Sequence, residues 1–102
     1  MDKQQFFKAN ALPTDSVSIE GWGEVPIQSL TLDQRLVLPD KFKELGNGET
    51  SYWIMAVGVV GFDDDDIPNI RNTDPKIVTE VVEAILALSG YGDDEEDEAK
   101  ND

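Results

Sequence analysis

The sequence contains no cysteine and no histidine. The absence of cysteine excludes disulfide bonds and thiolate metal ligands, and the absence of histidine excludes imidazole ligands and histidine-based acid–base catalysis. Any stability must therefore come from packing. A chain of 102 residues can bury a core without cross-links but is too short for two domains.

Basic residues are also scarce. Eight lysines and arginines face 22 acidic residues, for a net charge of −14, so we expect no binding to nucleic acid or to an anionic membrane surface. Residues 93–102 hold seven of the acids and one lysine. We predict a single domain over residues 1–92 and a disordered acidic tail over residues 93–102.

Long apolar runs are missing as well. No run reaches the roughly 20 residues that span a bilayer, and the N-terminus lacks the apolar core of a signal peptide. We therefore expect a soluble, cytoplasmic protein.

The sequence offers no catalytic pattern: no nucleophile–base pair, glycine-rich phosphate loop or metal-ligand spacing is present. The four aspartates at residues 63–66 lack the alternating ligands and central glycine of an EF-hand loop. We interpret them as a solvated loop between helices rather than a calcium site. The prediction is a non-enzymatic protein with no metal and no cofactor.

Two apolar stretches, residues 52–62 and 77–88, dominate the rest of the chain. The first has no period-two alternation and would be too long for a small domain if it were extended. It therefore predicts a buried helix over residues 52–61, whose glycines let a neighbouring backbone approach closely. The second follows an aspartate cap and a proline, Asp74 and Pro75, and predicts an amphipathic helix over residues 75–89 with Ile85 inward.

Upstream of these helices, alternating polar and apolar residues on both sides of the turn at residues 20–23 predict a β-hairpin over residues 17–30. Thr31 and Gln34 form a capping box that starts a helix over residues 31–45, broken or kinked at Pro39. We expect Leu32, Leu36 and Val37 to face inward. The glycines at 46 and 48 predict a loop, with Thr50 or Ser51 capping the next helix. The predicted fold class is α+β, mostly α: a short N-terminal hairpin followed by three helices.

Exposed apolar side chains are the candidates for partner contacts. We assign this role to Phe6, Phe7, Trp22, Val25 and Ile27. The alternatives are that the two phenylalanines pack back onto the core and that Trp22 is a lid over the core. Residues 4–11 form a short helix or belong to a mobile leader. A lone hairpin is marginal in water, so its edge is also expected to lean on the helices or to pair with another subunit.

Five segments, in order, resemble the tail assembly chaperones of long-tailed phages and related prophages. Their shared marks are a leader ending in Leu-Pro, a Trp-Gly before the second strand, a Leu-Thr helix start, an apolar helix and a final helix ending in Ser-Gly. The segments are Phe7-Lys-Ala-Asn-Ala-Leu-Pro13, Gly21-Trp-Gly-Glu-Val-Pro-Ile27, Leu30-Thr-Leu-Asp-Gln-Arg35, residues 53–60 and residues 81–90.

The resemblance implies a homo-oligomeric chaperone of the host bacterial cytoplasm, absent from the mature virion. Such proteins bind the tape measure protein, keep it soluble and help recruit tail tube protein through a longer form made by ribosomal frameshifting. Ala99, Lys100 and Asn101 can encode a slippery run if their codons are GCA, AAA and AAC; the alternative is an ordinary dipeptide in an acidic tail. The rival function is an acidic decoy that mimics phosphates and blocks a nucleic-acid-binding protein.

Overall fold

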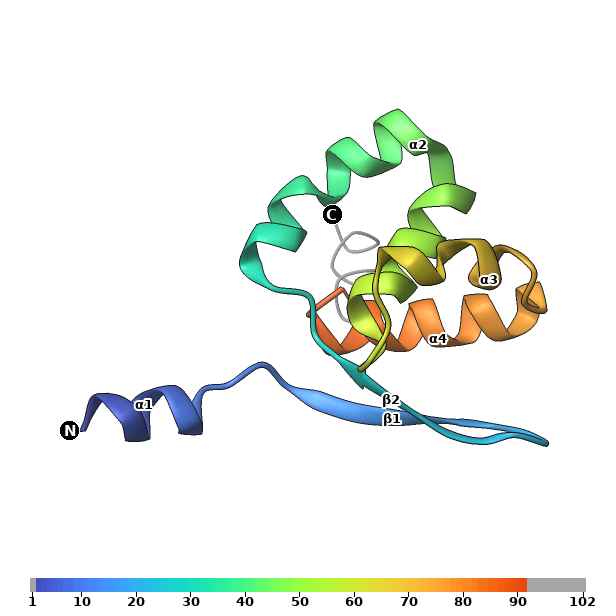
Figure 1. The fold of residues 1–102 in the computed structure, drawn as a ribbon. Coiled ribbons are helices and arrows are strands. Elements are labelled where there is room, and N and C mark those ends of the chain that lie inside the picture. The colour runs from blue at the N-terminus through green and yellow to red at the C-terminus, as the bar shows by residue number, and fades with distance from the viewer. Residues whose placement is uncertain (1, 92–102) are drawn as a thin grey trace, which may run out of the picture.

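The computed structural model describes residues 2–91, and the acidic tail and the candidate frameshift residues lie outside that range. A hairpin lies beneath a group of helices, and a short N-terminal helix projects from one end of the hairpin (Figure 1). The elements in chain order are α1 (Lys3–Ala9), β1 (Thr14–Ile19), β2 (Gly23–Gln28), α2 (Leu32–Gly58), the 3₁₀ turn η1 (Asp64–Asp66), α3 (Ile67–Arg71) and α4 (Pro75–Leu88). The predicted class, a hairpin followed by helices, is confirmed.

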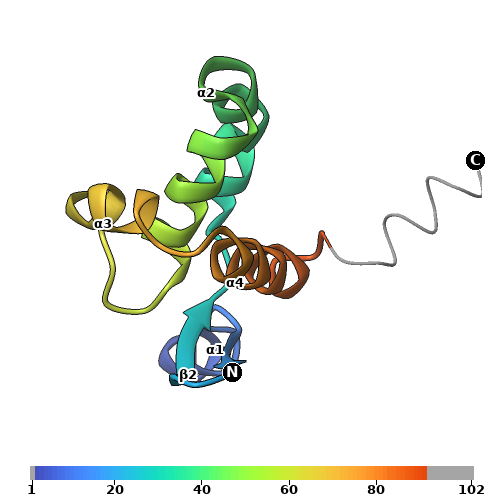
Figure 2. The same ribbon diagram turned by 90° about the vertical axis from the view of Figure 1, so that its right-hand side faces the viewer.

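The hairpin is antiparallel, with Val17 opposite Val25 and Ile19 opposite Gly23. Directly opposed residues share a face of the sheet, so the buried Val17, Ile19 and Ile27 all face the helices. The opposite face is polar; there the Ser16 hydroxyl donates to Glu24 Oε1 at 2.6 Å. The apolar face of the hairpin is covered by α4, as Figure 2 shows.

The outer side of β2 is joined to the chain that follows α2. Val59 forms an isolated bridge with Ile27, and the Val60 amide donates to the Pro26 carbonyl at 3.0 Å. Pro26, which has no amide proton, sits on this little-paired side, as expected for an edge position. This bridge ends α2 at Gly58 instead of continuing the helix to residue 61 as predicted.

The predicted capping box at the start of α2 is present. The Gln34 amide donates to Thr31 Oγ1 at 3.1 Å, and the Thr31 amide donates to Gln34 Oε1 at 2.8 Å. The helix then runs through Pro39 without breaking and turns sharply at Gly46, whose φ is +80°. The predicted break at Pro39 and the three-residue loop at 46–48 are therefore wrong. A single glycine in a left-handed conformation makes the turn.

Thr50 and Ser51 are inside the second limb of α2 and cap nothing. Thr50 is completely buried, and its hydroxyl donates to the Lys41 carbonyl at 2.9 Å. The Lys41 ammonium lies 5.3 Å from the centre of the Trp53 ring. These contacts join the two limbs across the Gly46 turn, which a purely local capping prediction could not foresee.

The side chains of Leu32, Leu36 and Val37 point outward, contrary to prediction, with 68%, 66% and 40% of their surfaces exposed. Leu38 is the residue of this limb that is buried. At 100° per residue, Leu38 lies on a different face from Leu32 and Leu36. Apolar residues surround this limb, so their spacing did not identify the inward face.

The predicted helix at the C-terminus is confirmed as α4. The Asp74 carboxylate accepts a hydrogen bond from the Lys76 amide at 3.0 Å, and Ile85 is fully buried. The aspartate run, predicted as a solvated loop between helices, is largely exposed but forms η1 and leads directly into α3, a helix that was not predicted. Asp63 and Asp66 cap each other reciprocally, which organises the turn. No helix within residues 2–91 combines the length and the hydropathy that a bilayer span requires.

Candidate protein-binding surfaces

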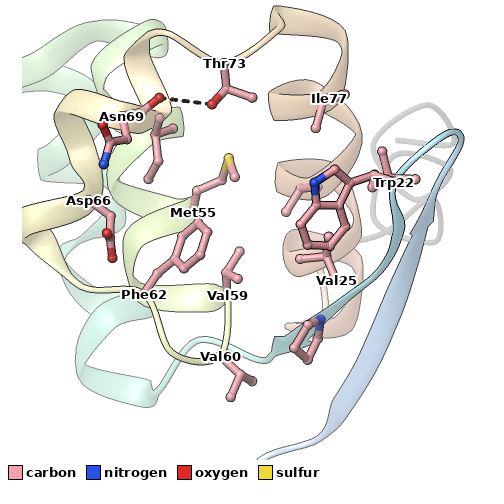
Figure 3. A pocket seen from close by; sticks show the side chains of 14 residues that line it. Trp22, Val25, Met55, Val59, Val60, Phe62, Asp66, Asn69, Thr73 and Ile77 are labelled. Atoms are coloured by element: carbon pink, nitrogen blue, oxygen red, sulfur yellow. Dashed lines mark hydrogen bonds between the residues drawn. The ribbon is translucent and has the colours of Figure 1, made fainter.

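A groove of about 380 Å³ opens between the hairpin turn, the end of α2 and the α3–α4 pair. Its lining is mainly apolar. The hairpin contributes Ile19, Trp22, Val25 and Pro26, and the helices contribute Ile70, Ile77 and Val81. Trp22 and Phe62 stand on opposite sides of the groove, with Met55 between them (Figure 3). We call this feature the Trp22 groove.

Two glycines place Trp22 at the tip of the hairpin. Gly21 and Gly23 have φ angles of +82° and +128°, and the Trp22 amide donates to the Ile19 carbonyl at 3.0 Å. The indole is 76% exposed. It therefore forms a wall of the groove and is not a lid over the core, which was the alternative interpretation of the sequence.

The facing wall is built by a second tight turn. Gly61 has a φ of +94°, and the Phe62 amide donates to the Val59 carbonyl at 3.0 Å. This turn brings Phe62 back against the groove with 41% of its surface exposed, beside Val60 at 46%. Neither residue was predicted as a contact residue, although a glycine before an aromatic at the end of an apolar run was a usable signal.

The polar part of the lining comes from η1 and α3. Asp66, Asn69 and Thr73 line the groove, and the Thr73 hydroxyl donates to the Asn69 carbonyl at 3.0 Å. The Asp66 carboxylate accepts a hydrogen bond from the Asp63 amide at 2.9 Å. Within residues 2–91, no group of three or more acidic side chains is arranged to hold a metal ion. Chemically, the groove suits an apolar side chain with a positive charge nearby.

The predicted contact residues do not form one site within a molecule. Phe6 and Phe7 lie on α1, at the end of the hairpin away from the turn (Figure 1). They are 45% and 63% exposed, and α1 has no buried residue, so packing onto the core is not observed. Val25 lines the Trp22 groove, whereas Ile27 is 2% exposed and belongs to the core. Ile27 therefore presents no surface to a partner.

A second apolar surface follows the first limb of α2. Leu32 and Leu36 lie one helical turn apart on the same face, and both are about two-thirds exposed. We call this pair the α2 row. The sequence assigned both leucines to the core because it could not locate Leu38, the residue that actually packs inward.

Cationic side chains cover aromatic rings away from the Trp22 groove. The Arg35 guanidinium lies 5.0 Å from the Tyr91 ring centre, and the Arg71 guanidinium lies 5.7 Å from that of Tyr52. Arg71 Nε also donates to Glu49 Oε1 at 3.1 Å. This hydrogen bond, and the charge of the carboxylate, raise the pKa of Arg71 above its usual value. These arginines are engaged in holding helices together.

Comparisons with known proteins add no relative: no protein-family model, no curated protein and no solved structure matches the chain. The surfaces described above and the resemblance of the sequence segments are therefore the features that bear on function.

Proposed function

We propose that this chain is a non-enzymatic tail assembly chaperone of a long-tailed phage. It binds the tape measure protein, keeps it soluble in the host cytoplasm and helps recruit tail tube protein. The proposal is supported by the segments that resemble this family and by their order along the chain. They run from the leader ending in Leu12-Pro13 to the final helix ending in Ser89-Gly90.

The observation that carries the proposal is the α2 row. Leu32 and Leu36 are 68% and 66% exposed on a limb whose other face already contributes Leu38 to the core. Two leucines at i and i+4 match the apolar stripe of a partner helix that crosses them. A tape measure protein, being long and helical, presents such stripes repeatedly.

The charge of the domain supports the same role. Residues 1–92 hold fifteen acidic and seven basic residues, a net charge of −8. A client that exposes apolar helices is prone to aggregate, and a coat of acidic domains keeps the complex soluble by mutual repulsion. Client binding then requires apolar contacts, which the α2 row provides, more than ion pairs.

Co-expression with the tape measure protein tests the proposal. The Leu32→Ser/Leu36→Ser double variant should fold normally, because both side chains are exposed, but should leave the tape measure protein largely insoluble. Val37→Ser is the matched control: it removes an exposed apolar side chain from the same limb but from a different face. Circular dichroism verifies that each variant is folded.

The proposal fails if the tape measure protein is equally soluble with the double variant, or if it needs no chaperone. Retention of a basic DNA-binding protein, with no retention of the tape measure protein, would instead support the acidic-decoy hypothesis. The tape measure protein and the basic DNA-binding protein are each tested for retention on the same immobilised wild-type chain, so the two outcomes are distinguishable.

A further inference from the structure

Two surfaces of complementary chemistry lie at opposite ends of the hairpin. At one end, α1 exposes Phe6 and Phe7, with ring centres 5.5 Å apart in an edge-to-face pair. At the other end, the Trp22 groove is apolar and open. Six residues of β1 separate them, a span of roughly 20 Å, and α1 projects away from the groove (Figure 1). In this conformation, α1 cannot fill the groove of its own molecule.

The charges of the two surfaces are also complementary. Residues 2–13 carry Lys3 and Lys8 against the single acid Asp2, whereas residues 14–91 carry fourteen acids and five bases. The groove has Asp66 in its lining and the other aspartates of η1 beside it. Glu20 lies next to the hairpin turn on the other side. A basic aromatic helix is therefore the kind of ligand that the groove is built to attract.

The outer edge of β1 provides the means of joining two molecules. Within residues 2–91 the sheet has only two strands, and β1 pairs with β2 alone. The Ser29 amide donates to the Pro13 carbonyl at 2.9 Å. Because hydrogen-bonded and non-hydrogen-bonded pairs alternate in an antiparallel ladder, the amides and carbonyls of Thr14, Ser16 and Ser18 point away from β2. Such an edge is a template for another strand.

We propose that the chain forms a two-fold dimer in which the β1 edges pair antiparallel and α1 of each copy binds the Trp22 groove of the other. Antiparallel pairing places the start of one β1 beside the end of the other. The α1 helix of one molecule therefore lies next to the hairpin turn of its partner, which carries Trp22.

The surface buried by this exchange is adequate for a stable dimer. Phe6, Phe7 and Trp22 are each between 45% and 76% exposed in one molecule. Six such aromatic side chains from the two copies would bury on the order of 600–1,000 Å². Together with the paired strands, this approaches the roughly 1,200–2,000 Å² of a specific interface.

Tryptophan fluorescence and sedimentation test the dimer together. The chain has two tryptophans, so Trp53→Phe leaves Trp22 as the only reporter. As the concentration of this full-length variant rises, Trp22 emission should shift to shorter wavelength in step with the appearance of dimer mass. A monomer at all concentrations, or a dimer in which Trp22 emission does not change, would overturn the proposal.

Two further variants separate the two contacts, and a third is their control. Phe6→Ser/Phe7→Ser alters a helix without buried residues and should raise the dimer dissociation constant at least tenfold. Leu32→Ser/Leu36→Ser, which removes equally exposed apolar surface elsewhere, should leave it unchanged. Ser16→Pro removes an amide that points outward to the Asp15 carboxylate at 2.8 Å, so it should preserve the hairpin but block edge pairing.

Equal loss of dimer in the α2-row variant, or dimerisation unaffected by the phenylalanine substitutions, would refute the exchange. This dimer does not depend on the tape measure protein. Its failure would leave the chaperone proposal standing, and failure of tape measure binding would leave the dimer standing.

Discussion

A Cβ atom placed on Gly58 would lie 2.6 Å from Ile85 Cδ1 and 2.7 Å from Ile85 Cγ2. The last turn of α2 therefore packs directly on the C-terminal part of α4. We expected the glycines of this apolar helix to let a neighbouring backbone approach closely. Gly58 does permit a close approach, but the group that approaches is the Ile85 side chain. This contact joins the two helices that contribute Met55, Ile77 and Val81 to the lining of the Trp22 groove.

Gly58→Ala should destabilise the protein by about 1–3 kcal/mol, because the added methyl group overpacks the core against Ile85. Urea denaturation followed by circular dichroism measures the change. Ile85→Val, which removes Cδ1, should recover part of the loss in the double variant.

The control for this prediction is Gly48→Ala. A Cβ there meets nothing within 4 Å, and Gly48 lies in the second limb of α2. Alanine should stabilise the helix by roughly 0.4–1 kcal/mol. Equal effects at positions 48 and 58 would contradict the packing argument.

Ile85→Asp should be severely destabilising, by more than about 4 kcal/mol, because it places an unpaired carboxylate at a fully buried position. A thermal melt measures the effect. Ile85→Val should cost only about 0.5–1.5 kcal/mol. An unchanged melting temperature in the aspartate variant would mean that the assigned inward face of α4 is wrong.

Ser89→Ala should cost about 1–3 kcal/mol, since Ser89 Oγ accepts the Leu30 amide at 2.9 Å and donates to the Ile85 carbonyl at 2.7 Å. Both Leu30 and Ser89 are buried, so the substitution leaves the amide without a partner. Ser51→Ala removes a hydrogen bond of similar geometry on a more exposed helix face, to the Asn47 carbonyl, and should have little effect. The two variants are compared by chemical denaturation.

Self-association should strengthen with added salt. Each copy carries a net charge of −14, and screening of this repulsion outweighs the weakened attraction of two lysines for the partner's acidic groove. Light scattering across a salt series at high protein concentration measures this. A strict monomer at high salt would refute it.

The gene should contain the codons GCA, AAA and AAC at Ala99, Lys100 and Asn101, residues outside the part of the chain that the structure describes. In that phase two adjacent tRNAs can re-pair one nucleotide back and produce a longer form. Sequencing the gene tests this directly, and an AAG lysine codon would remove the prediction. Mass spectrometry of infected cells should then find an extended product that shares residues 1–100.

Elements defined by neighbouring residues were predictable from the sequence. The capping box at Thr31 and Gln34, the start of α4 at Asp74 and Pro75, and the hairpin turn around Gly21 depend on hydrogen bonds and φ angles within a few residues. Such interactions form in the same way whatever surrounds them, so a local pattern is sufficient to identify them.

The candidate surfaces were predictable only in part. Trp22 and Val25 line a groove, and their role as contact residues stays a prediction, whereas Ile27 is buried and pairs with Val59 after α2. Phe62 was missed. The pairing of Ile27 with Val59 joins residues more than thirty positions apart, which no short-range pattern encodes. Phe62, by contrast, follows a glycine at the end of an apolar run, which is a local signal.

The sequence by itself determined the hairpin, the starts of α2 and α4, the amphipathic face of α4 and the acidic charge, because these follow from local geometry and composition. Only the tertiary structure decided which face of the first limb of α2 is buried, where α2 ends, and that α1 remains exposed. Those outcomes depend on which apolar side chains are buried, because the core has room for only some of them. Leu38 and Ile27 are buried there, while Leu32, Leu36 and Phe7 remain at the surface.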